Sequence, residues 1–263
     1  MSMGSVMYRI KEDDTIILYD NESQKKRIIS LKSSKGRLNT DKGFITLSEL
    51  VGMKYGSTIS TQLGFEYTVL PINLFDFIMK KLNRLTQIVY PKDAAYIAFK
   101  LDVKPGDTVI ESGIGSGAMS CVFAHYIGKN GRLISYEIRD EFIENAYSNI
   151  KKVGFEDRVE IKHRDIAEGF DETDADSIFL DVKEPWLYLR HAYNALKAGG
   201  MLGILIPTVN QAEETLRELN LFSFIDLEVS ELLLRKYKPT PGRFRPQDRM
   251  GAHTAFMIFA RKI

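Results

Sequence analysis

The stretch DTVIESGIGSGA spans residues 107–118 and joins a short apolar run to three glycines within five residues. The apolar run is typical of a buried strand, and the residues from Ala118 onward predict a helix. Glycine has no Cβ, so the backbone can turn sharply and approach a ligand closely. This strand–loop–helix unit predicts a binding pocket for a nucleotide-type cofactor.

Helices and strands alternate in the predicted pattern from residue 84 to residue 219. Helices are expected at 91–101, 118–127, 140–153 and 211–219, with another ending at 196–200, and strands at 108–111, 132–136, 159–163, 177–180 and 201–206. Strands 227–236 and 253–261 have no helix between them and should pair antiparallel. We expect an α/β fold, a doubly wound, mainly parallel, seven-stranded Rossmann-like sheet with an antiparallel C-terminal hairpin.

The first 70 residues follow a different pattern, with short β segments separated by Gly, Asn, Asp and Ser. These segments are 15–19, 27–31, 44–47 and 67–70. Pro71 marks a boundary, and residues 74–82 have helical spacing of apolar side chains. We predict a small β domain at 1–72, with an accessory role, and a second domain at 73–263.

Composition indicates a soluble globular protein, because 44% of the 263 residues are hydrophobic and 27% are charged. No apolar stretch approaches the roughly 18 residues that a membrane-spanning helix needs. The only cysteine, Cys121, excludes an intramolecular disulfide and fits the cytoplasm. The four histidines show no metal-ligand spacing, so no metal site is expected.

Positive charge is concentrated in two segments, although the net charge is only +1. Residues 25–42 carry seven basic side chains against Asp41 alone, and residues 235–249 carry six against Asp248 alone. Each segment could be a solvated surface or could contact phosphates. Tyr237 and Phe244 stand among the charges of the second segment, and its prolines and glycine predict a loop.

Acidic residues follow three predicted strands of the sheet: Glu137, Asp165 and Asp181. Ligands of doubly wound sheets bind beyond the carboxyl ends of the strands. Glu137 could accept hydrogen bonds from both ribose hydroxyls of either NAD or S-adenosylmethionine, and Asp165 could accept one from an adenine amino group. The alternatives are a surface carboxylate for Glu137, a helix N-cap for Asp165 and a turn or cap role for Asp181.

Several motifs, in this order and spacing, resemble the tRNA adenine-N1 methyltransferases that modify the T-loop, a class I family dependent on S-adenosylmethionine. The motifs are RLTQIVYPKD (84–93), ESGIGSG (111–117), YE (136–137), LDVKEPW (180–186), Gln211, RFRP (243–246) and GAHT (251–254). The likeness covers residues 84–263 closely and residues 1–70 in architecture.

The resemblance implies methylation of N1 of adenine 58 of tRNA, and in archaeal relatives also of adenine 57. Asp181 would accept a hydrogen bond from the target amino group. Tyr90 is a candidate to stack on the base or else a core tyrosine before Pro91, and His253 could contact base or RNA or be a structural histidine that starts the last strand. The donor would be held by Gln87, Gly113, Ile114, Gly115, Ser116, Gly117, Glu137, Asp165 and Asp181, and RNA by Arg243, Arg245 and Lys183. A homotetramer is also implied.

Two residues depart from the family pattern, which usually has Thr in place of Ile114 and Pro near Lys183.

Three alternative functions stay open. They are a non-catalytic tRNA-binding subunit, an NAD-dependent oxidoreductase, for which no hydride-transfer pair stands out, and a class I methyltransferase with a protein or small-molecule substrate.

Overall fold

The computed structural model describes residues 9–31 and 36–263, so Lys32 and Lys35 of the first basic segment lie outside the described residues. Contacts divide the chain into two compact units, Met1–Lys81 and Leu82–Ile263. Helix α1 (Leu74–Lys80) belongs to the first unit, whereas the sequence pattern put the boundary before it.

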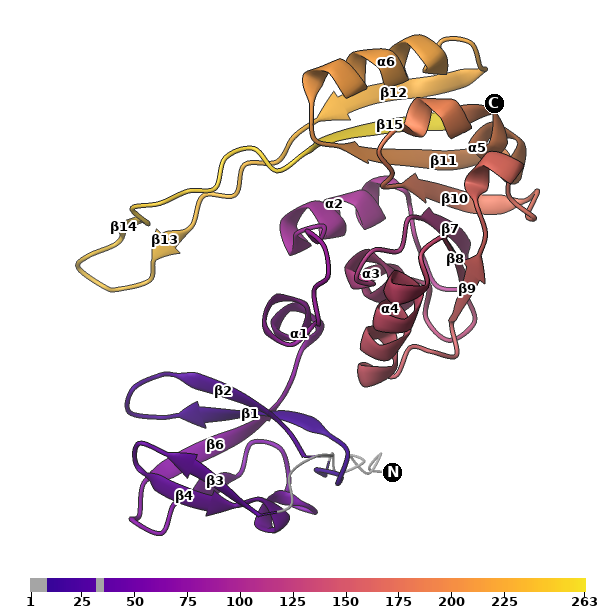
Figure 1. The fold of residues 1–263 in the computed structure, drawn as a ribbon. Coiled ribbons are helices and arrows are strands. Elements are labelled where there is room, and N and C mark those ends of the chain that lie inside the picture. Colours follow the sequence, from indigo (N-terminus) through magenta and orange to yellow (C-terminus); the bar gives the residue numbers. More distant parts are fainter. Residues whose placement is uncertain (1–8, 32–35) are drawn as a thin grey trace, which may run out of the picture. The chain divides into compact units, whose positions relative to one another are not determined.

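The first unit is built around a four-stranded antiparallel sheet with the order β2-β1-β6-β5 (Figure 1). Its described elements are β1 (Thr15–Asp20), β2 (Lys26–Ser30), β3 (Arg37–Thr40), β4 (Gly43–Thr46), η1 (Leu47–Leu50), β5 (Thr58–Ser60), β6 (Glu66–Pro71) and α1. Strands β3 and β4 form a separate antiparallel pair. Alternate apolar residues, including Ile16, Leu18 and Val69, fill one core. The predicted small β domain is confirmed, and β3 and β5 are additional strands.

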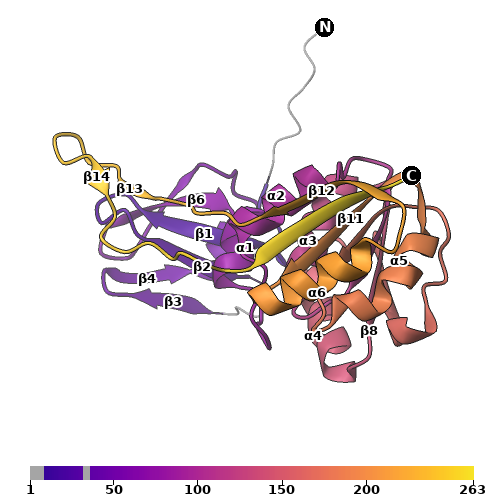
Figure 2. The ribbon, with the colours of Figure 1, turned by 90° about the horizontal axis from the view of Figure 1, so that it is seen from above.

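The second unit contains a seven-stranded sheet with the order β12-β15-β11-β10-β7-β8-β9. Its strands are β7 (Thr108–Ser112), β8 (Arg132–Glu137), β9 (Val159–His163), β10 (Ala175–Leu180), β11 (Leu196–Ile206), β12 (Phe224–Ser230) and β15 (Phe256–Lys262). All neighbouring pairs from β11 to β9 are parallel, and β15 is antiparallel to both β11 and β12. The expected fold is confirmed, with the antiparallel hairpin at one edge (Figure 2).

The helices of the second unit precede or connect its parallel strands. They are α2 (Pro91–Lys100), α3 (Ala118–Ile127), α4 (Asp140–Lys152), α5 (Leu189–Ala195) and α6 (Val209–Leu219), with the short helices η2 (Ile166–Glu168) and η3 (Pro185–Tyr188). The chain moves from β7 outward to β9 and then returns to β10 on the other side of β7. Because parallel crossovers are right-handed, α3 and α4 cover one face and α5 the other. The order therefore reverses between β7 and β10, which is where such sheets bind ligands.

Two segments differ from the sequence-based expectation. Residues 196–200 do not end a helix, because Leu196 pairs with Ala175 and the register then shifts to Met201 opposite Ser177. The glycines accommodate this irregularity, and Gly199 has a φ of 77°. Residues 231–236 leave the sheet, because β15 begins only at Phe256 and offers them no partner.

The chain between β12 and β15 forms an extended arm, residues 231–255, that projects from the seven-stranded sheet in both views (Figures 1 and 2). Its outer part is a minimal antiparallel ribbon of β13 (Tyr237–Lys238) and β14 (Arg245–Pro246). The rings of Tyr237 and Phe244 stack with centroids 5.0 Å apart.

Candidate active site

The loop after β7 is shaped by close approaches that leave little room for a Cβ. Gly115 has a φ of 52°, and a Cβ there would lie 3.3 Å from the Thr86 hydroxyl oxygen. A Cβ on Gly113 would lie 3.3 Å from Oε2 of Glu137. The glycines thus allow the loop to lie directly against residues that line a cavity.

Glu137 ends β8 with its two carboxylate oxygens in different surroundings. Oε1 accepts hydrogen bonds from the backbone N–H groups of Ile138 (3.0 Å) and Arg139 (3.2 Å) and from Arg139 Nε (3.1 Å). Oε2 lies beside Gly113 and makes no hydrogen bond to any residue within the described ranges. The side chain is therefore fixed by one oxygen and keeps the other available to a ligand hydroxyl.

Asp181 follows β10, directly beside the glycine loop. Its backbone N–H donates to the Ser112 carbonyl over 2.5 Å, and Gly113 N–H donates to the Asp181 carbonyl over 3.4 Å. The residue is open to solvent through the cavity. The carboxyl group is nevertheless surrounded by protein, and the resulting desolvation raises its pKa to about 6. At neutral pH the group is an anion that gains from a nearby positive charge.

Glu111 is a buried carboxyl group within β7, only 1% exposed. Its Oε2 accepts hydrogen bonds from Ser120 Oγ (2.6 Å) and Ser135 Oγ (2.8 Å). Burial raises its pKa to about 8 despite these bonds, and the charges of Asp181 and Glu137 raise it further. The cavity thus holds a carboxyl group whose neutral form predominates near neutral pH.

The leading segment, which we define as residues 83–90, closes one side of the cavity. Ser116 Oγ accepts hydrogen bonds from the backbone N–H groups of Leu85 (3.0 Å) and Thr86 (3.4 Å). Gln87 is exposed, and its amide makes only a long 3.5 Å contact with the Ile88 carbonyl. Its side chain is therefore available to a ligand.

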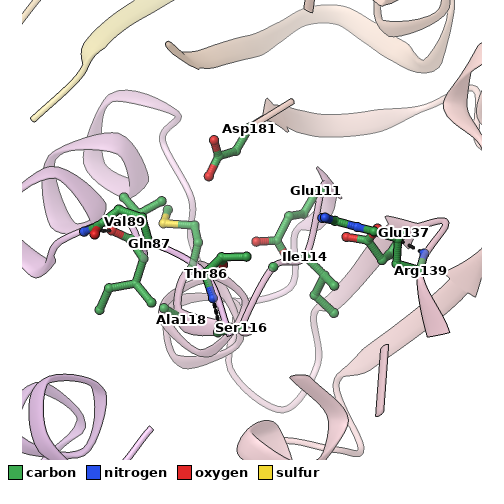
Figure 3. A pocket seen from close by; sticks show the side chains of 14 residues that line it. Thr86, Gln87, Val89, Glu111, Ile114, Ser116, Ala118, Glu137, Arg139 and Asp181 are labelled. Atoms are coloured by element: carbon green, nitrogen blue, oxygen red, sulfur yellow. Dashed lines mark hydrogen bonds and ion pairs between the residues drawn. The ribbon is translucent and has the colours of Figure 1, made fainter. Parts of the chain in front are cut away.

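Fourteen residues from five parts of the second unit line this cavity, which has a volume of about 180 Å³. They are Thr86, Gln87, Ile88, Val89, Glu111, Gly113, Ile114, Gly115, Ser116, Ala118, Met119, Glu137, Arg139 and Asp181. Figure 3 shows the carboxylates of Asp181 and Glu111 pointing into the same open centre, with Gln87 on one side and Glu137 on the other.

The structure brings seven of the predicted site residues together in this lining. They are Gln87, Gly113, Ile114, Gly115, Ser116, Glu137 and Asp181. The other predicted residues lie outside it: Gly117, Tyr90, Asp165, Lys183, His253, Arg243 and Arg245. Gly117 has a φ of 76° and packs against Ala146 on α4, so it closes the loop rather than facing the cavity.

Tyr90 and Asp165 each occupy a helix start. Tyr90 is the residue before Pro91 at the beginning of α2 and is half-buried. Asp165 caps η2, because its Oδ1 accepts the Ala167 backbone N–H over 2.8 Å. Its Oδ2 makes no hydrogen bond within the described part of the chain and is exposed. Capping therefore uses one carboxylate oxygen of Asp165 and leaves the other available.

His253 is held where the arm meets the sheet. Nδ1 lies 2.7 Å from Glu231 Oε2, and Nε2 lies 2.9 Å from the Pro207 carbonyl oxygen. Both partners are acceptors, so the doubly protonated ring satisfies both, and Glu231 is the main reason that the pKa of His253 is raised. A contact with a nucleobase would require the ring to leave one of these partners.

The arm's cations fall into two groups. Asp248 binds Lys238 Nζ over 2.7 Å and Arg245 Nη1 over 2.6 Å. The remaining cations make no side-chain hydrogen bond or ion pair to any residue in the described ranges; they are Arg235, Lys236, Arg243 and Arg249. Arg243 is thus more available to a phosphate than Arg245. Lys183 is also exposed and makes no side-chain contact of this kind within those ranges.

Sequence reasoning missed several lining residues. Glu111 stands in the glycine motif, and an acid inside an apolar strand is itself a signal, since buried carboxyls need hydrogen-bond partners. Met119 and Thr86 gave no distinctive signal. Arg139 was treated only as a neighbour of Glu137, but its guanidinium lies 3.6 Å from the centroid of the Phe142 ring, which fixes it at the cavity wall.

Residues 9–31 and 36–263 contain no candidate metal cluster and no candidate membrane-spanning helix. Within those ranges, no three His, Cys, Asp or Glu side chains gather closely enough to hold a metal ion. Each helix of those ranges is too short or too polar to cross a bilayer. Cys121 is a buried free thiol.

The sheet order, the glycine loop after its first strand and the acids beyond β8 and β10 define a class I methyltransferase that uses S-adenosylmethionine. A family model described as tRNA methyltransferase complex GCD14 subunit matches residues 73–248. The chain belongs to this family.

Individual relatives are similar to this chain over most of its length. The tRNA (adenine(57)-N(1)/adenine(58)-N(1))-methyltransferase TrmI of Methanocaldococcus jannaschii is 29% identical over 257 residues, covering 88% of this chain and 90% of the relative. The structure of tRNA (m1A58) methyltransferase TrmI from Aquifex aeolicus is 34% identical in sequence, with a TM-score of 0.83. The match covers 97% of this chain and 99% of that one. A structure named SAM-dependent O-methyltransferase, from Thermotoga maritima, is 45% identical in sequence, with a TM-score of 0.90. The match covers 100% of this chain and 97% of that one.

Proposed function

We propose that this protein transfers a methyl group from S-adenosylmethionine to N1 of adenine 58 in the T-loop of tRNA, and that adenine 57 is a possible second target. The observation that carries the proposal is the cavity of this family member, in which the Asp181 carboxylate faces the glycine loop. Relatives at 29% and 34% identity are named for this reaction.

The donor side of the cavity fits S-adenosylmethionine. The Glu137 oxygen beside Gly113 would accept hydrogen bonds from the ribose hydroxyls, and the glycine loop would hold the amino-acid portion through backbone groups. Gln87 would close over the donor from the leading segment, and Ile114 would pack against it. Asp165 would accept a hydrogen bond from the donor adenine through its exposed oxygen. S-adenosylmethionine supplies an electrophilic methyl group on its sulfonium centre.

The acceptor side needs little acid–base chemistry, because adenine N1 has a free lone pair. Asp181 would accept a hydrogen bond from the exocyclic amine and stabilise the positive charge that the ring gains as the N1–C bond forms and the C–S bond breaks. Its ionised carboxylate suits that role at neutral pH. Tyr90 is our candidate to stack on the base, which must first be extruded from the T-loop at a cost of a few kcal/mol. A role for His253 at the base is a weaker proposal, since its ring is engaged at the arm.

The tRNA backbone would contact the arm and the loop after β10. Arg243 and Arg245, with their neighbouring cations, provide positive charge on an exposed ribbon, and Lys183 provides a further cation after Asp181. Four of the described cations of the first unit form ion pairs within it: Lys26 with Asp76, Arg27 with Asp41, Lys42 with Asp20 and Glu22, and Lys80 with Asp76. We assign that unit, residues 1–72 by the sequence boundary, an accessory role in tRNA binding.

We propose a homotetramer in the cytoplasm. The arm supports self-association, because a two-stranded ribbon is marginally stable alone in water and the arm as a whole exposes large apolar side chains. They are Leu233, Leu234, Tyr237, Phe244 and Met250. Light scattering on the purified protein would test the tetramer.

A second candidate is methylation of a hydroxyl group on another substrate, because one similar structure carries the name O-methyltransferase. A third is a tRNA-binding subunit without activity, which the intact glycine loop and Asp181 disfavour.

One assay separates these candidates. Purified protein is incubated with methyl-labelled donor and unmodified tRNA, and the product nucleoside is mapped. Label at N1 of adenine 58 is expected. Label at an oxygen or on another molecule would contradict the proposal, and binding of tRNA without transfer would favour the subunit reading.

A further inference from the structure

Asn149, on α4, is a fully buried side chain that contacts two segments of the cavity wall at once. Its Nδ2 donates to the carbonyl oxygens of Asn83 (2.8 Å) and Ser116 (3.0 Å). Its Oδ1 accepts the Asn83 backbone N–H over 3.0 Å. One side chain therefore fastens the start of the leading segment to the end of the glycine loop.

The orientation of this amide is fixed by its surroundings. Two carbonyl oxygens face Nδ2, whereas a backbone N–H and Lys152 Nζ (3.3 Å) face Oδ1. Both amide hydrogens and both oxygen lone pairs are thereby used. A flipped amide would place oxygen against two carbonyl oxygens, so the contact has a single arrangement.

Ser116 completes the fastening from the loop side. While its carbonyl oxygen accepts from Asn149, its hydroxyl oxygen accepts from the backbone of Leu85 and Thr86. The residues that follow, from Thr86 to Val89, line the cavity. The position of this wall relative to the glycine loop thus depends on bonds made at residues 83–86.

We propose that Asn149 is a positioning residue for donor binding, one that holds the leading segment against the glycine loop so that the donor pocket is assembled before the donor arrives. Asn149 does not itself line the cavity. The inference rests on the proposed assignment of this cavity to S-adenosylmethionine. Pre-organisation of this kind raises the affinity for the donor. The segment is already ordered in the free protein, so binding does not have to include the free-energy cost of ordering it.

Asn145 provides a matched control on the same helix. Its Nδ2 donates to the Asn83 carbonyl over 3.0 Å, and its Oδ1 accepts from Asn83 Nδ2 over 2.6 Å. It contacts the leading segment and makes no side-chain hydrogen bond to the glycine loop among the described residues. Asn145→Ala therefore loosens Asn83 but leaves the bridge to Ser116 in place.

The test measures binding of S-adenosylhomocysteine by calorimetry in wild type, Asn149→Asp, Asn149→Ser and Asn145→Ala. Each Asn149 variant loses bonds to buried carbonyl groups, so we expect affinity to fall by about tenfold or more. Asn145→Ala should lose clearly less affinity for S-adenosylhomocysteine than the Asn149 variants do. Hydrogen exchange of the Leu85 and Thr86 amides should accelerate in the Asn149 variants, and kcat at saturating donor should change much less than KM.

Three results would overturn the inference. They are unchanged affinity in the Asn149 variants, an equal loss in Asn145→Ala, and variants that fail to fold, since the last would assign Asn149 to stability alone. The proposed function fails separately. Wild-type protein that binds S-adenosylhomocysteine but does not methylate tRNA would contradict the substrate assignment and leave the role of Asn149 intact.

Discussion

The backbone N–H of Asp181 lies 2.5 Å from the carbonyl oxygen of Ser112, so the end of β10 is tied to the start of the glycine loop. These residues follow adjacent parallel strands, and the ladder between them brings a carboxylate next to a loop that can hold a cofactor. The carboxylate is thus placed by the sheet rather than by its own side-chain contacts.

Asp181→Asn should lower the methylation rate on the order of a hundredfold or more, because the amide cannot supply negative charge to the ring as it becomes cationic. Binding of S-adenosylhomocysteine should remain measurable. In wild type, the single-turnover rate should rise as pH increases through about 6 and then level off, as the carboxyl group ionises. A variant with undiminished rate would remove Asp181 from the mechanism.

Glu111→Gln should change how stability depends on pH. The folded-state pKa of Glu111 is raised to about 8 from an ordinary value of 4.5, so the unfolded chain loses this proton at lower pH than the folded chain. The wild type therefore loses stability as pH rises from about 4.5 to about 8. Glutamine cannot ionise, so the variant avoids this loss of stability, which is on the order of a few kcal/mol.

Denaturant titrations at pH 5 and pH 8.5 would measure the effect. The stability of Glu111→Gln relative to wild type should be clearly greater at the higher pH. Equal differences at both values would mean that Glu111 is ionised in the folded protein at neutral pH.

The sequence was sufficient for the parts of the site that depend on chain order. Glycines after a buried strand and acids at strand ends must converge once the sheet is parallel, and Gly113, Glu137 and Asp181 do so. Residue pattern alone could not find Asn149, because an Asn within an amphipathic helix looks like a surface residue. Its role depends on two segments that are distant in sequence and meet only in the folded unit.

The strand predicted for residues 227–236 extends too far into the arm, for a related reason. Residues 231–236 continue an apolar pattern that is typical of a strand, but a strand also needs a neighbour, and β15 starts only at Phe256. Local periodicity carries no information about where the partner begins. The same limit applies at 196–200, where a glycine pair that usually ends a helix accommodates an irregularity in β11.

His253→Gln should weaken the base of the arm at mildly acidic pH. The folded-state pKa of His253 is raised, chiefly by Glu231, so its contribution to stability is fully present below the unfolded value of about 6.5. That contribution is lost as pH rises through the folded value. Melting temperatures of variant and wild type should differ more at pH 5.5 than at pH 9, and a constant difference would argue against a charged ring.

Arg243→Ala should weaken tRNA binding and reduce its dependence on salt. Each phosphate contact contributes about 0.9 to the slope of log K against log salt concentration, so losing one contact should lower the slope by about that amount. Arg245→Ala is the matched control, because Arg245 is already paired with Asp248 at 2.6 Å and should matter less. Filter binding of unmodified tRNA across a salt series would measure both slopes, with light scattering to verify that assembly is unchanged. If the Arg243 variant kept the wild-type slope, the phosphate contacts would have to lie elsewhere than at this part of the arm.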